Sequence, residues 1–145
     1  MQELNLLRQY IEARDYDKAL EVVGELEEMS KEDKLNKIYS YAVILLIHLI
    51  KQQAENRTTR SWDFSIYNAT KQIDRTNKRR KSGGYYASEE ELIEILDDAF
   101  DTAIRKAALE VFEGRYTSEE LQTLIDPIAL RNRALELVTY SSFNS

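Results

Sequence analysis

The sequence predicts an all-α fold, a compact single-domain bundle of six or seven helices around a central apolar helix. Along most of the 145 residues, apolar side chains recur at intervals of three and four, which is the spacing of one helix face. Ser88 with Glu91 and Thr117 with Glu120 form capping boxes, which are typical of helix N-termini. No stretch of four or more residues alternates convincingly enough to predict a strand. A chain of this length is the size of one domain, so we expect residues 1–145 to fold together.

The first two helices are expected to form a hairpin. Asp15 or Asp17 can cap the second helix. The run 13–21 (ARDYDKALE) resembles part of a tetratricopeptide repeat, but no second copy follows about 34 residues later. Gly24 lies inside the second helix at a cost of about 1 kcal/mol relative to alanine, so we expect close packing there. The residues on the inner faces are Leu4, Leu7 and Ile11, then Ala19, Val22, Val23 and Leu26.

A third helix is predicted from Ser30 or Glu32 to Glu55. It is apolar nearly all round, which indicates that other helices surround it and that it is the centre of the fold. After the polar break at 56–59 (NRTT), Ser61 is placed to cap a fourth helix. The inner face of the fourth helix comprises Trp62, Ile66, Ala69 and Ile73.

Residues 77–86 are predicted to form a mobile basic loop, because like charges repel and adjacent glycines give the backbone freedom. A fifth helix should then run from the capping box at Ser88 to Gly114. A short helix follows Thr117, and Asp126 caps a last helix with Pro127 at its first position. Residues 141–145 are expected to be a frayed tail.

Two segments, 45–52 (LLIHLIKQ) and 60–66 (RSWDFSI), are separated by a short polar connection. They resemble the core signature of domain-of-unknown-function family 29, a bacterial and mainly cyanobacterial family. The likeness covers roughly residues 23–111, and the stretch 25–29 (ELEEM) is a third, weaker point of agreement. The resemblance implies an all-helical domain and implies no biochemical activity.

The composition is that of a soluble, helix-rich protein, with 32% charged and 43% hydrophobic residues and one proline. Because cysteine is absent, disulfides, thiolate catalysis and sulfur-based zinc sites are excluded. The N-terminus lacks the basic start of a signal peptide. The most apolar window, 41–50, has about ten residues, whereas a membrane-spanning helix needs about 20. We therefore expect a cytoplasmic protein that does not enter a membrane.

His48 and Arg60, both in the signature segments, are the candidate catalytic residues. An imidazole titrates near neutral pH, so His48 is a candidate proton carrier or metal ligand. The alternative is a buried, structurally bonded side chain. Arg60 either clamps a phosphate at a helix N-terminus or pairs with a nearby acidic residue. Trp62 is expected to be a core anchor.

One helical face of the fifth helix carries four carboxylates at spacings of three and four, which suit a magnesium or manganese ion. The alternative is a solvated face on which Asp101 pairs with Arg105. No cofactor is predicted. The four candidate metal ligands are Glu94, Asp97, Asp98 and Asp101.

The charge changes sign along the chain. Residues 57–81 hold eight basic and two acidic residues, a net charge of +6, whereas the other residues sum to −12. Positive charge beside aromatic rings is typical of nucleic-acid binding, but an acidic chain favours docking on an acidic protein surface or on a second copy. The candidate binding residues are Lys71, Arg75, Lys78, Arg79, Arg80, Lys81, Tyr85 and Tyr86.

Two functions follow from these candidates. The favoured one is a cytoplasmic binding or assembly module, whose basic segment docks an acidic partner or polyanion. The alternative is a metal-dependent phosphoesterase or nuclease that uses His48, Arg60 and the acidic face of the fifth helix. The enzyme requires these three groups to converge in one pocket.

Overall fold

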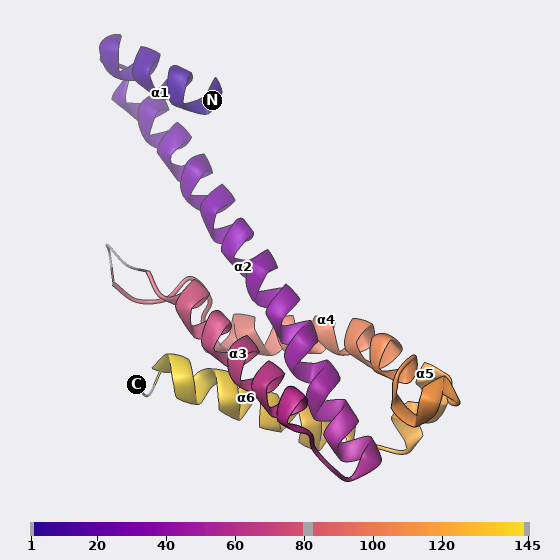
Figure 1. Cartoon of the computed structure of the whole chain (residues 1–145). Coiled ribbons are helices and arrows are strands. Elements are labelled where there is room, and N and C mark those ends of the chain that lie inside the picture. The colour runs from indigo at the N-terminus through magenta and orange to yellow at the C-terminus, as the bar shows by residue number, and fades with distance from the viewer. Residues whose placement is uncertain (1, 80–82, 144–145) are drawn as a thin grey trace. The chain divides into compact units, whose positions relative to one another are not determined.

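A computed structural model describes residues 2–79 and 83–143 (Figure 1). Six α-helices and one 3-10 turn account for its regular structure, which confirms the all-α class. The strand-like pairing within the described ranges is a single antiparallel bridge between Lys78 and Tyr85. The elements are α1 (Gln2–Glu12), α2 (Tyr16–Glu55), α3 (Arg60–Asn77), α4 (Glu89–Ala108), η1 (Val111–Gly114), α5 (Ser118–Thr123) and α6 (Pro127–Phe143).

The chain divides into two compact units, Met1–Lys34 and Leu35–Ser145. The first unit contains α1 and the beginning of α2, joined by a tight turn in which Arg14 has a φ of 61°. The Asp15 carboxylate accepts a hydrogen bond from the Lys18 amide at 3.3 Å, as expected for the cap of the second helix. That all 145 residues fold as one domain stays a prediction.

The predicted second and third helices are one continuous helix of 40 residues, α2. The expected break before Ser30 or Glu32 was wrong, because no proline or glycine interrupts residues 25–55 and most of the residues near the expected break favour helix. The expectation about Gly24 was also wrong. A Cβ built at Gly24 would meet no atom within 4 Å, so no close packing requires this glycine.

The second unit is a helical bundle whose core is formed around the C-terminal half of α2. Leu45, Leu46 and Ile50 are completely buried, which confirms the predicted central apolar helix. The α4 helix contributes four buried alanines, three of which recur every four residues and permit close packing of helices. These three are Ala99, Ala103 and Ala107, and the fourth is Ala108. The α6 helix packs against both α3 and α4.

The capping signals largely gave the correct helix starts. The boxes at Ser88 and Thr117 are both formed, and the Asp126 carboxylate accepts a hydrogen bond from the Ala129 amide at 3.1 Å. The cap of α3 is Thr59 and not Ser61, since the Thr59 hydroxyl accepts from the Trp62 amide at 3.0 Å.

The end of α4 also differs from the expectation. The helix stops at Ala108 and not at Gly114, because Phe112 and Glu113 take left-handed conformations with φ of 51° and 59°. At the C-terminus, α6 continues to Phe143, and residues 144–145 of the expected tail lie outside the described residues.

Candidate functional site

The two signature segments meet at the corner between α2 and α3. The Gln52 amide nitrogen donates to the Thr58 hydroxyl at 2.7 Å and to the Asp63 carboxylate at 3.2 Å. The Thr58 hydroxyl donates to the same carboxylate oxygen at 2.7 Å. Gln52 belongs to the first segment and Asp63 to the second, so their hydrogen bond joins the two segments across the corner.

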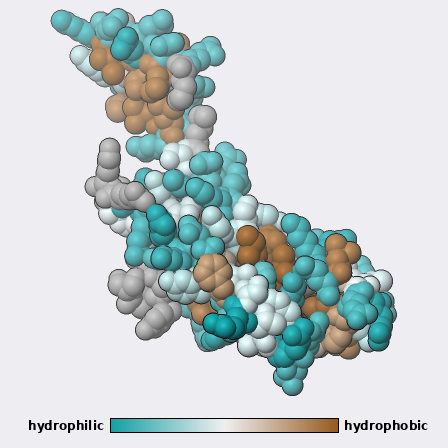
Figure 2. All heavy atoms as spheres, viewed as in Figure 1, coloured by the Kyte–Doolittle hydropathy of each residue, from teal (hydrophilic) through white to brown (hydrophobic). Residues whose placement is uncertain are grey.

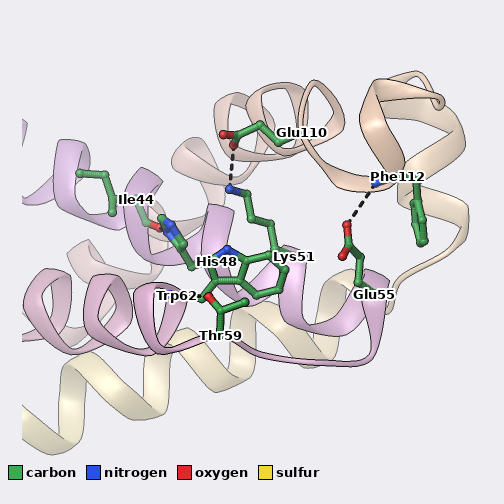
Figure 3. Close-up of polar contacts among 8 residues, drawn as sticks. All are labelled: Ile44, His48, Lys51, Glu55, Thr59, Trp62, Glu110 and Phe112. Atoms are coloured by element: carbon green, nitrogen blue, oxygen red, sulfur yellow. Dashed lines mark hydrogen bonds and ion pairs between the residues drawn. The ribbon is translucent and has the colours of Figure 1, made fainter.

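Lys51 and Trp62 lie beside each other in this corner (Figure 3). The Lys51 ammonium is 2.9 Å from the Glu110 carboxylate and 5.7 Å from the centre of the Trp62 ring. The Arg57 guanidinium lies 4.7 Å from the same ring. Trp62 is only half-buried, so the expectation of a core anchor was wrong. Its ring instead attracts two cations by cation–π interaction.

Glu55 connects the end of α2 to the left-handed turn η1. Its carboxylate accepts a hydrogen bond from the Phe112 amide at 3.1 Å and another from the Arg57 guanidinium at 2.8 Å (Figure 3 shows the first). The Phe112 amide hydrogen bond, followed by that of Arg57, holds the pKa of the Glu55 carboxyl below its usual 4.5. The charged carboxylate therefore holds a strained segment of backbone in place.

Replacing Glu55 with glutamine is expected to lower the free energy of unfolding by about 1 kcal/mol at neutral pH, because two hydrogen bonds to a charged acceptor become weaker. A carboxyl with a lowered folded-state pKa contributes stability above its unfolded pKa and loses it as the pH falls through the folded pKa. The difference between Glu55→Gln and wild type should thus shrink below about pH 4.5. Urea denaturation at a series of pH values measures it.

Glu94→Gln is the matched control, because Glu94 is exposed and forms no hydrogen bond or ion pair within the described residues. Its effect should be near zero at every pH. A Glu55→Gln effect that stayed constant down to acidic pH would show that the charge of Glu55 has no part in holding the turn.

His48 is bonded within its own helix. Its Nδ1 atom lies 2.8 Å from the Ile44 carbonyl oxygen one turn earlier, so Nδ1 carries a hydrogen and donates it (Figure 3). The predicted structural bond is present, but the side chain is half-exposed and not largely buried. Arg60 is exposed at the first position of α3 and forms no hydrogen bond or ion pair with any described residue.

The four candidate metal ligands on α4 are all exposed. Asp101 pairs with Arg105 at 3.2 Å, as the solvated alternative predicted, and Asp97 lies 3.6 Å from Arg131 on α6. In the ranges that the structure describes, no three acidic or histidine side chains gather into a group able to hold a metal ion. No hydrogen bond or ion pair there joins these carboxylates to His48 or Arg60.

The basic candidates on α3 lie along one exposed face of the helix, together with two aromatic residues that the sequence reasoning missed. Phe64 and Tyr67 are 64% and 60% exposed, and their ring centres lie 6.4 Å apart. The Lys71 ammonium lies 5.8 Å from the Tyr67 ring. We call this face the α3 stripe, which comprises Arg60, Phe64, Tyr67, Lys71 and Arg75 on α3 and Lys78 at its C-cap.

The α3 stripe points away from the core. Its positions are separated by three or four residues, so they lie on one side of the helix. The opposite side carries Ala69 and Ile73, each 1% exposed, which pack in the core. This spacing relative to Ala69 and Ile73 was the sequence signal that would have identified Phe64 and Tyr67.

The basic segment after α3 is fixed at both ends. The Arg79 amide donates to the Gly84 carbonyl at 3.0 Å, and the Tyr86 amide donates to the Asn77 carbonyl at 2.9 Å. The Arg79 guanidinium lies 5.1 Å from the Tyr86 ring, and Lys78 pairs with Asp74 at 3.1 Å. Tyr85 is half-buried beside them, whereas Arg80 and Lys81 lie outside the described residues. The mobility of this loop stays a prediction.

Asn77 is a further residue that the sequence reasoning missed. It is the last residue of α3 and is completely buried. Its side-chain oxygen accepts a hydrogen bond from the Ala87 amide at 2.7 Å, and its nitrogen donates to the Ala87 carbonyl at 3.5 Å. Asn77 thereby closes the base of the segment between α3 and α4.

Within the described residues, no helix combines the length and the apolarity needed to cross a membrane.

Comparison with known proteins identifies a family and no activity. No curated protein and no solved structure matches the chain. The match to the family described as Domain of unknown function DUF29 covers residues 2–126, which extends beyond the likeness noted in the sequence at both ends. Most of the chain lies within this match, and the protein belongs to the DUF29 family.

Proposed function

We propose that the protein is a cytoplasmic helical docking module whose α3 stripe binds an acidic, helical surface of another protein. The composition and exposure of the α3 stripe are the main support for this proposal. It presents two exposed aromatic rings among four positive side chains, in the positions that face a neighbouring helix at three- and four-residue spacing. Two of its arginines, Arg60 and Arg75, form no ion pair with a described residue and are available to a partner.

The chemistry of the α3 stripe favours a protein over nucleic acid. The chain has a sequence pI of about 5.0, whereas domains that bind nucleic acid usually have a basic pI. Exposed Phe64 and Tyr67 supply the aromatic contact area that is common at the centre of protein interfaces. The cations around them provide orientation and a faster association rate. The absence of cysteine agrees with a cytoplasmic location.

Reversal of charge on the α3 stripe should weaken docking. A synthetic helical peptide with leucine and glutamate at three- and four-residue spacing is the probe, and fluorescence anisotropy measures its binding. Lys71→Glu combined with Arg75→Glu should weaken binding by about tenfold or more, because attractive pairs become repulsive. Phe64→Ala combined with Tyr67→Ala should weaken it as well, by removing the aromatic contacts.

The matched control is Lys106→Glu combined with Arg133→Glu. Both residues are exposed, on α4 and α6, and the double change alters the net charge by the same amount. The control should bind the peptide almost as well as wild type. An equal loss of peptide binding in the stripe variant and the control variant would indicate that net charge alone determines binding. Binding of a single-stranded oligonucleotide, without binding of the peptide, would make the α3 stripe a nucleic-acid site. Either result overturns the proposal.

A further inference from the structure

The hairpin of α1 and the start of α2 exposes a large part of its apolar side chains. Figure 2 shows apolar residues gathered on this unit. Leu4 and Ile11 on α1 are each 50% exposed, and Tyr16 and Leu20 on α2 are 59% and 68% exposed. A surface pocket on α1 is lined by Leu4, Leu7, Arg8, Ile11 and Glu12.

This hairpin is too small to be stable by its own core. α1 has no buried residue, and among the described side chains of unit Met1–Lys34 only Ala19 and Val22 are buried. Units below about 40 residues usually need disulfides, metals or association to fold. The sequence has no cysteine, and no metal-binding group lies among the described residues. Association with another helix would supply the buried apolar area that the hairpin lacks.

The charge of the hairpin selects the kind of helix that can cover it. Residues 1–34 contain ten acidic and five basic residues, a net charge of −5. Two hairpins would therefore repel each other, whereas a basic helix would be attracted. Tyr16, Leu20 and Glu27 are exposed and Val23 is half-buried, and together they form a ridge on α2. Its three- and four-residue spacing matches that of the α3 stripe.

We propose that the acidic hairpin of one copy of this chain receives the α3 stripe of a second copy. The inference rests on the proposed function and names the partner. Phe64 and Tyr67 would bury the apolar ridge, while Lys71 and Arg75 would face the acidic residues at its border. A contact between two different surfaces of identical chains is heterologous, and it builds rings or longer assemblies. A closed dimer forms instead if each copy binds the hairpin of the other with its own α3 stripe.

A charge-swap experiment tests the contact, with sedimentation velocity as the measurement. Wild type should self-associate with increasing concentration, and salt should weaken the association. Stripe reversal (Lys71→Glu, Arg75→Glu) and hairpin reversal (Glu12→Lys, Glu27→Lys) should each abolish it. Glu12 and Glu27 are exposed, so the reversal leaves the fold intact. A mixture of the two variants, or one chain with all four changes, should associate again because attraction is restored.

The outcomes separate this inference from the proposed function. A wild-type chain that stays monomeric at every concentration, while the stripe still binds the acidic peptide, removes the second copy as partner and leaves the docking module standing. A monomeric chain whose stripe does not bind the peptide removes both. Association that survives stripe reversal, or that is not restored by the mixture, shows that other surfaces form the contact and overturns the inference. Circular dichroism confirms that each variant is folded.

Discussion

Replacing Leu45 with alanine is expected to lower the free energy of unfolding by about 2–5 kcal/mol, the largest effect of any single change considered for this protein. Leu45 lies in the part of α2 that the other helices surround, and it has no exposed surface. Truncation loses the transfer free energy of the removed methyl and methylene groups and leaves a cavity that close-packed neighbours fill only in part. Urea denaturation followed by circular dichroism measures the loss.

Leu109→Ala is the control for this prediction, because Leu109 is the same residue type but is 77% exposed at the end of α4. Its effect should lie within about 0.5 kcal/mol of zero. A Leu45→Ala effect as small as that of Leu109→Ala would mean that α2 is not the centre of the second unit. Equal m-values for both variants would show that the unfolded states expose similar surface.

The features that sequence predicted best are local ones. A capping box joins a hydroxyl and a glutamate three residues apart, so Ser88 with Glu91 and Thr117 with Glu120 could be identified without tertiary structure. The pair Asp101–Arg105 is likewise determined by spacing on one helix turn. The buried face of α4 follows from the periodicity of its apolar residues.

The features that sequence missed depend on partners far away in the chain. Thr59 and Ser61 are both suitable caps, and bonds from Gln52 to Thr58 and Asp63 fix the position at which α3 begins. The position of Trp62 depends on the cationic groups of Lys51 and Arg57, which lie near its ring. The residues next to Trp62 in the sequence do not indicate these contacts.

The candidate site was only partly predictable for the same reason. The charge reversal along the sequence identified the basic residues of α3, but it did not indicate that Phe64 and Tyr67 share their face. The inner residues Ala69 and Ile73 were predicted correctly, and the exposed face follows from them by geometry. His48 and the α4 carboxylates were selected by residue type, which contains no information about whether their side chains meet.

Replacing Asn77 with alanine is expected to lower the free energy of unfolding by about 1–3 kcal/mol. Asn77 and Ala87 are 0% and 1% exposed, so water cannot replace the lost side-chain oxygen at the Ala87 amide. An unsatisfied buried donor costs its full desolvation free energy. Asn77→Leu should be destabilising to a similar extent, since it fills the volume without accepting the hydrogen bond.

Hydrogen exchange provides the specific measurement for Asn77. In wild type, the Ala87 amide is buried and donates to Asn77 at 2.7 Å, so it should be protected. In Asn77→Ala it should exchange much faster, while amides in the middle of α2 lose protection only in proportion to the global stability. Asn36→Ala, at an exposed position of α2, should leave both the stability and the exchange of Ala87 unchanged. Unaltered protection of Ala87 in Asn77→Ala would mean that another group closes the segment between α3 and α4.

The same substitution should affect the bridge between Lys78 and Tyr85, because Lys78 is the residue after Asn77. This bridge should weaken together with the hydrogen bond to Ala87, and the C-terminal end of the α3 stripe should then become less ordered.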